Sequence, residues 1–152
     1  MTAVIILKGP PRTKKNSQVL VRSGSKMIPL PSRSYREYES ACLAQLRYAK
    51  TPAADPEGGP YNVRCLYYMP TRQRVDLTNL LEATDDILVK AGILPDDSSE
   101  YVGGHDGSRV LHDKANPRVE ITITAMERFA HPVNEKPGVQ ADNQQQGRDA
   151  MR

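Results

Sequence analysis

The sequence lacks tryptophan altogether and contains only one phenylalanine and two cysteines. Its longest apolar run, residues 3–7, has five residues, far below the roughly 18 that a membrane-spanning helix needs. The first residues show no signal-peptide pattern. Cys42 and Cys65 have no zinc-module spacing, so each is expected to pack as a small apolar side chain. These absences argue against membrane, secreted and zinc-finger proteins, and predict a chain that works in a reducing cytosol.

Charges of opposite sign collect in two parts of the chain. Residues 1–50 carry ten Lys and Arg against two Glu, whereas residues 76–100 carry seven Asp and Glu against one Lys. A basic segment suits a polyanion, and an acidic cluster repels one unless a cation lies between them. The combination indicates a metal-dependent enzyme that acts on nucleic acid. Two solvated faces of opposite charge are the alternative.

The apolar pattern predicts an α+β fold with a mixed sheet and two main helices in a single small domain. Period-two alternation and β-branched runs predict strands over residues 2–7, 18–22, 26–30, 61–69, 100–103, 109–111 and 117–126. Apolar residues at helical spacing predict helices over 34–50 and 76–91, the second closed by Gly92. The domain is expected to span residues 1–126. Residues 127–152, rich in polar residues, are expected to form a disordered tail.

Carboxylates surround the second predicted helix. Asp76 precedes it, Glu82 lies on its polar face, and Asp96 and Asp97 follow in a turn. Hard oxygen ligands of this kind suit Mg²⁺ or Mn²⁺, which can activate water and stabilise a leaving oxygen in phosphodiester hydrolysis. A structural explanation also holds for each, since Asp76 would cap the helix and the Asp pair would form an ordinary turn.

Basic residues flank these acids. The candidates for phosphate contact are Arg12, Lys14, Lys15, Arg72 and Arg74. Such contacts supply affinity and salt dependence, not sequence choice. The alternative for each is an ordinary surface charge.

The remaining polar residues suggest no second chemistry. His105, His112 and His131 lack the spacing of zinc ligands, and His105 is expected to be solvated in a glycine-rich turn. No Ser or Cys arrangement for nucleophilic catalysis is evident. A covalent mechanism is therefore not expected.

Several of these segments together resemble the RusA family of Holliday junction resolvases. They are Met69-Pro70, Arg72-Gln73-Arg74, Asp76-Leu77-Thr78-Asn79-Leu80, Asp86, Ala91-Gly92 and Asp96-Asp97, with residues 9–15 as the early basic loop and 116–121 as the last strand. The resemblance covers residues 3–126. It implies a Mg²⁺-dependent homodimer, with Mn²⁺ as a possible substitute, whose two acidic sites each cut one strand of a four-way DNA junction. Many relatives are phage-encoded, which implies the cytosol of a bacterial host.

The resemblance also implies site residues. The acidic residues of the family correspond to Asp76 and Asp97, which are implied to bind the metal together with the neighbouring Asp96. One departure is Thr78, where members often have a second aspartate, and another is Glu82, where some have lysine. A hydroxyl is a poorer Mg²⁺ ligand than a carboxylate. A junction- or single-strand-binding protein without cleavage therefore stays open, as does a plain nucleic-acid adaptor whose acids are only caps and turns.

If Glu82 replaces the acid missing at position 78 as a catalytic carboxylate, Glu82→Gln will lower cleavage nearly as much as Asp76→Asn. The rate of junction nicking in Mg²⁺ measures this. Cleavage that Glu82→Gln leaves unchanged would show that Glu82 does not compensate.

Overall fold

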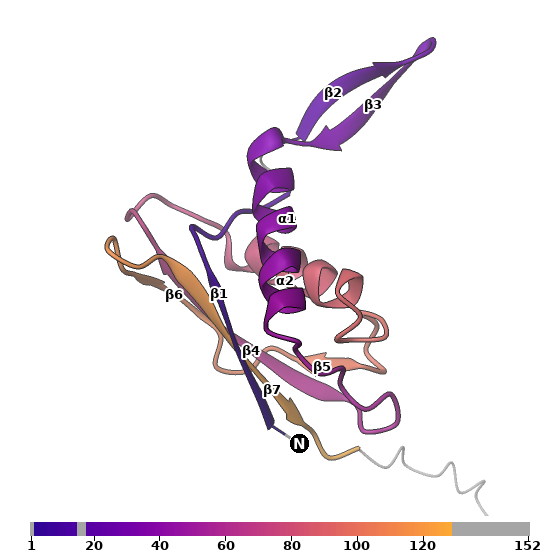
Figure 1. Cartoon of the computed structure of the whole chain (residues 1–152), viewed down its shortest axis with the longest axis vertical. Helices are drawn as coiled ribbons and strands as arrows, with labels where there is room; N and C mark the ends of the chain where they lie inside the picture. The colour runs from indigo at the N-terminus through magenta and orange to yellow at the C-terminus, as the bar shows by residue number, and fades with distance from the viewer. Residues whose placement is uncertain (1, 15–17, 129–152) are drawn as a thin grey trace, which may run out of the picture.

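The computed structural model describes residues 2–14 and 18–128, and shows two helices on one face of a sheet (Figure 1). In chain order the elements are β1 (Thr2–Lys8), β2 (Gln18–Ser23), β3 (Lys26–Pro31), α1 (Arg33–Tyr48), β4 (Tyr61–Met69), α2 (Leu77–Lys90), β5 (Val102–Gly104), β6 (Arg109–His112) and β7 (Arg118–Ala125). The predicted α+β fold is confirmed. Lys15 and most of the expected tail, residues 129–152, lie outside the described residues. No described helix has the length and apolarity to cross a membrane.

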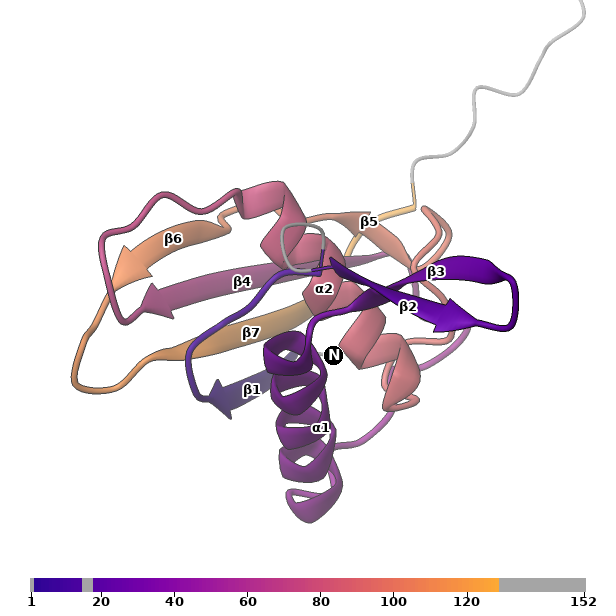
Figure 2. The ribbon, with the colours of Figure 1, turned by 90° about the horizontal axis from the view of Figure 1, so that it is seen from above.

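The main sheet is mixed, as predicted. β7 lies between β1 and β4 and pairs antiparallel with both. β5 and β6 pair parallel with the other edge of β4, near its start and its end respectively. Figure 2 shows β6, β4, β7 and β1 side by side in that order. The chain thus leaves β4, crosses over through α2 and returns parallel, so the loop after β4 lies beside the carboxyl end of β6.

The core lies between the sheet and the helices. The register places Ile5, Ile121 and Cys65 in one row across three strands, and all three are buried. Val4 and Ile6 point to the opposite face and are 69% and 51% exposed, because successive side chains of a strand alternate between faces. Both cysteines are unpaired and fully buried, as predicted. Burial raises the pKa of the Cys42 thiol to about 11, so the thiol stays protonated and inert.

Local signals set both ends of α2. The Asp76 side chain accepts a hydrogen bond from the Thr78 N–H at 3.0 Å, which satisfies one free donor of the first turn. Gly92, at φ +74°, follows the last turn, in the left-handed conformation that glycine adopts most easily. The predicted apolar stripe is confirmed, since Leu80, Ile87 and Leu88 are buried.

In the turn between β5 and β6, side chains take the place of main-chain hydrogen bonds to β4. His105 Nδ1 lies 2.9 Å from the Val63 carbonyl oxygen, and Ser108 Oγ accepts from the Cys65 N–H at 2.9 Å. His105 Nε2 lies 2.9 Å from Oδ2 of Asp85, a buried residue of α2. The expectation of a solvated His105 is therefore wrong. The interrupted ladder leaves buried main-chain groups on β4, and polar side chains of the turn satisfy them.

The contacts of His105 define its protonation. Both ring nitrogens face acceptors, so the ring donates from both only when it carries two protons. The hydrogen bond to Asp85 raises the pKa of His105, although burial opposes this. Asp106 adds a further negative charge nearby.

We expect this pair to stabilise the folded chain more at low pH than at high pH. Because the pKa of His105 is raised in the folded state, its stabilisation is fully present below the ordinary histidine pKa of about 6.5. It is lost as the pH rises through the higher folded value. Urea unfolding from about pH 6 to about pH 8 measures this loss, which His105→Gln should remove. His112→Gln, an exposed control, should keep it. The same pH dependence in His105→Gln would contradict the assignment.

Candidate active site

Two of the proposed phosphate-binding arginines come together from distant parts of the sequence. A groove of about 300 Å³ separates the first loop from the connection between β4 and α2. It is lined by Pro10, Pro11, Arg12, Met69, Pro70, Thr71, Gln73, Arg74 and Val75. Arg12 and Arg74 are exposed, and guanidinium groups match the geometry of phosphate oxygens. The groove ends next to Asp76, at the start of α2.

Arg72 lies on another side of the same connection. With Thr71 and Gln73, it lines a second groove whose opposite wall is formed by Val110, Leu111 and His112 at the end of β6. The parallel pairing of β4 with β6 brings these segments together. The connection between β4 and α2 therefore places Arg74 in the first groove and Arg72 in the second, rather than both in one cluster.

Asp76 is exposed and acts as the helix cap described above. The structural explanation for this residue is thus observed. It does not exclude a second role, because a carboxylate has about four lone-pair sites, and Oδ1 accepts the capping bond.

Asp96 and Asp97 lie exposed in the turn that follows α2. Partial loss of hydration raises the pKa of Asp97, and the negative charges of Asp96 and Asp86 raise it further. A hydrogen bond from the Asp97 N–H lowers the pKa of Asp96, as does one from Ser98. The repulsion felt at Asp97 is the kind that a bound cation relieves.

Lys14 connects the basic first loop to the acidic centre, which consists of Asp86, Asp96 and Asp97. Its ammonium donates to the Asp86 carboxylate and lies 5.8 Å from the centre of the Tyr35 ring. The Lys14 and Asp86 side chains are 26% and 27% exposed. Lys14 is therefore engaged by a carboxylate of its own chain, which holds residues 12–14 against α2. Tyr35 is buried.

The sequence analysis assigned no role to two aspartates of α2. Asp86 belongs to a polar stripe that solvation also explains, and only the fold shows its bond to Lys14. Asp85 offered a signal, because it lies four residues after Leu81 and three before Leu88, on the apolar face. A carboxylate there needs a buried partner, and His105 is that partner.

Asp76 lies before the start of α2, and Asp96 and Asp97 follow its end. Asp86 lies on α2 ten residues after the cap Asp76, about 15 Å along a helix axis, with exposed Glu82 between them. Within residues 2–14 and 18–128, no three His, Cys, Asp or Glu lie close enough to hold one ion. Among those residues the structure therefore shows no preformed three-ligand site, and the assignment of Asp76, Asp96 and Asp97 to a metal stays a prediction. Mg²⁺ commonly binds one or two carboxylates and keeps several waters, and Asp96 with Asp97 fits that habit.

The comparison with known proteins covers both the basic first loop and the acidic segment. A family model described as endodeoxyribonuclease RusA matches residues 8–124, which include the groove, α2 and the acidic turn. A search of curated proteins returned no match.

We expect Mg²⁺ to stabilise the folded chain through the acidic turn. A ligand that binds only the folded state adds about 2.7 kcal/mol at a concentration about 100 times its Kd. Thermal unfolding with and without Mg²⁺ measures this gain, which Asp97→Asn should reduce. Glu37→Gln, an exposed acid of α1, is the matched control. A gain that Asp97→Asn leaves unchanged would show that the turn holds no cation.

Proposed function

This chain belongs to the RusA family of endodeoxyribonucleases, and we propose that it is a divalent-metal-dependent nuclease that resolves branched DNA, specifically four-way Holliday junctions. The observation that carries the proposal is the position of the acidic centre. Asp97 and its acidic neighbours are linked through Asp86 and Lys14 to the loop whose Arg12 lines the basic groove. Acids for a metal and cations for a phosphate backbone thus lie on connected elements.

The basic groove supports binding of the DNA backbone. Arg12 and Arg74 hold a phosphate from two sides of the groove, and Arg72 holds a second phosphate at the end of β6. Lys14 and Lys15 follow Arg12 in the sequence and belong to the same proposed phosphate-binding segment. Fixed cations at these places orient the scissile phosphodiester and offset the charge that develops in the transition state.

The acids complete the proposed chemistry. Asp76 and Asp97 are the residues that would hold the metal, with Asp96 and Glu82 as supporting acids. A divalent ion held there, Mg²⁺ or Mn²⁺, would supply an activated water and would stabilise the leaving oxygen. The net reaction adds water across one P–O bond of each cut strand.

Paired cutting needs two sites, because a four-way junction is resolved by nicks in two strands. We therefore propose a homodimer that presents one acidic site to each strand. As in phage-type relatives, it would act in DNA recombination and repair in the cytosol of a bacterial host.

A junction-binding protein without cleavage is the second candidate. Thr78 favours it, since this position offers a hydroxyl and its N–H already binds Asp76. Such a protein keeps the basic groove and needs no metal for affinity, so metal dependence separates the two functions.

We expect the chain to nick a labelled four-way junction symmetrically in Mg²⁺, and to leave a linear duplex of matching sequence intact. EDTA should abolish nicking, because the proposed water is activated only on a bound metal. Asp97→Asn should abolish nicking and keep junction binding, whereas Glu37→Gln should keep both. Tight junction binding without nicks in Mg²⁺ or Mn²⁺ would establish the binding protein instead.

A further inference from the structure

The β2–β3 hairpin is the part of the described chain that projects farthest from the sheet. Its two strands pair only with each other and extend beyond the start of α1 (Figures 1 and 2). Strands of six residues reach about 20 Å. An isolated two-stranded hairpin is marginally stable in water, so this hairpin gains stability from whatever covers it.

Large apolar side chains of the hairpin are exposed. One face combines Leu20 with Pro29, its cross-strand partner, and Arg22 with Met27. Leu20 is 67% exposed and Met27 is 57% exposed. Val21 and Ile28 on the other face are 41% and 42% exposed. Contiguous exposed apolar residues of this kind mark a binding surface.

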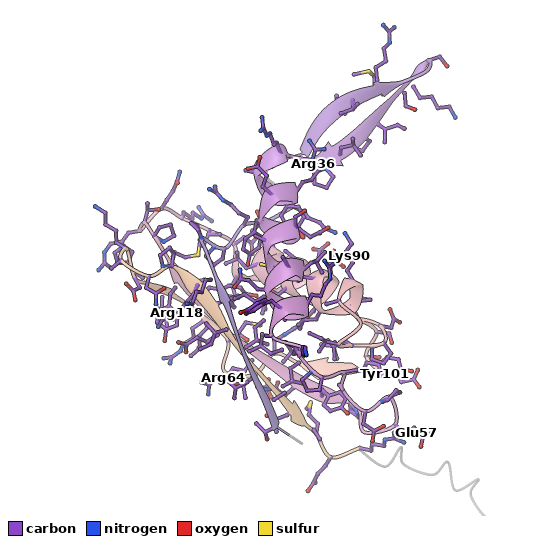
Figure 3. All side chains as sticks on the ribbon, in the orientation of Figure 1. Arg36, Glu57, Arg64, Lys90, Tyr101 and Arg118 are labelled. Carbon is purple, nitrogen blue, oxygen red and sulfur yellow. The ribbon has the colours of Figure 1, made fainter. Side chains whose placement is uncertain are left out.

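Charge identifies the partner of this surface. Residues 9–36 contain seven Lys and Arg and no Asp or Glu. Arg22 and Lys26 flank the tip of the hairpin, and Arg36 lies at its base on α1, as Figure 3 shows. Arg33, also at the base, pairs with Glu37. A surface of one sign repels the same surface of a second copy and attracts a polyanion, so DNA fits this hairpin better than the hairpin of another subunit.

The hairpin is anchored next to the acidic centre. The segment that enters it is held on α2 by the Lys14–Asp86 bond. The segment that leaves it begins α1, where Ser32 accepts from the Tyr35 N–H at 3.2 Å. α1 is in turn tied to α2 by an ion pair of Lys90 with Glu39 at 2.7 Å. A hairpin bound to DNA therefore lies in a defined position relative to Asp97, whose pKa Asp86 helps to raise.

We propose that the β2–β3 hairpin is a wedge that inserts Leu20 and Met27 among the bases at the centre of a branched DNA, while Arg22 and Lys26 hold the adjoining phosphates. This rests on the proposed function and adds the source of its selectivity. Leucine, methionine and proline are among the side chains that separate base steps in bent DNA. Separation costs least where pairing is already interrupted, so a wedge favours a branch point over continuous duplex.

The test uses a four-way junction with 2-aminopurine at the crossover and a matched linear duplex. Binding of the wild-type chain should raise the 2-aminopurine fluorescence, because the base loses its stacking. The double variant Leu20→Ser, Met27→Ser should remove this rise and lower the preference for the junction about tenfold or more. The matched control is Val4→Ser, Ile6→Ser, since these apolar residues are 69% and 51% exposed on the open sheet face. Thermal unfolding checks that both variants fold.

The outcomes separate the wedge from the function on which it rests. Junction nicking by wild type, with fluorescence and preference unchanged in the hairpin variant, would overturn the wedge and leave the nuclease. Equal loss of affinity for junction and duplex would overturn it in favour of a groove contact. Conversion of a dimer to a monomer, measured by sedimentation, would make the hairpin a subunit contact instead. A wild-type chain that neither prefers nor nicks the junction would overturn both proposals.

Discussion

Burial of α2 against β4 and β7 is the constraint on which the rest of this structure depends. Leu80, Ile87 and Leu88 of the helix are buried in one cluster with the inward row of the strands. This packing fixes which residues of α2 and its flanking turns remain at the surface. Asp76 at the start and the acidic turn beyond the end are both exposed, because neither belongs to the packed face. The same crossover brings β6 alongside β4 and thereby forms the groove beside Arg72.

Electrostatics connects this core to the proposed chemistry. The basic first loop and the acidic helix carry opposite charge in the sequence, and the fold joins them through Lys14 and Asp86. Lys14 and Lys90 form ion pairs within the molecule, which neutralise part of that charge. The arginines of the groove and the carboxylates of the acidic turn remain exposed. A cation between acid and phosphate is the simplest way for both sets to act on one substrate.

The two proposals assign hydrolysis and the selection of branched DNA to different parts of the molecule. Hydrolysis is assigned to groups on a packed helix and its adjoining turns, where position is precise. Selection of branched DNA is assigned to a projecting hairpin, whose apolar side chains have no place in the core. The Asp85–His105 pair belongs to neither part. It closes a gap in the sheet ladder beneath α2, and so holds the helix around which the proposed acids lie.

Local patterns in the chain were enough to predict the elements, their faces and the cap of α2. These signals are the apolar periodicity, Asp76 before the helix and Gly92 after it. Each acts over a few residues, so it can be recognised in the sequence alone. The contacts of the site could not be recognised in this way. Arg12 with Arg74, Lys14 with Asp86 and Asp85 with His105 join residues far apart in the chain. The assignment of Asp76 and Asp97 to a metal came from the resemblance to the RusA family rather than from spacing along the chain, and it stays a prediction. Helical rise and sheet pairing set the distances between residues far apart in the chain, and neither is a property of the local sequence.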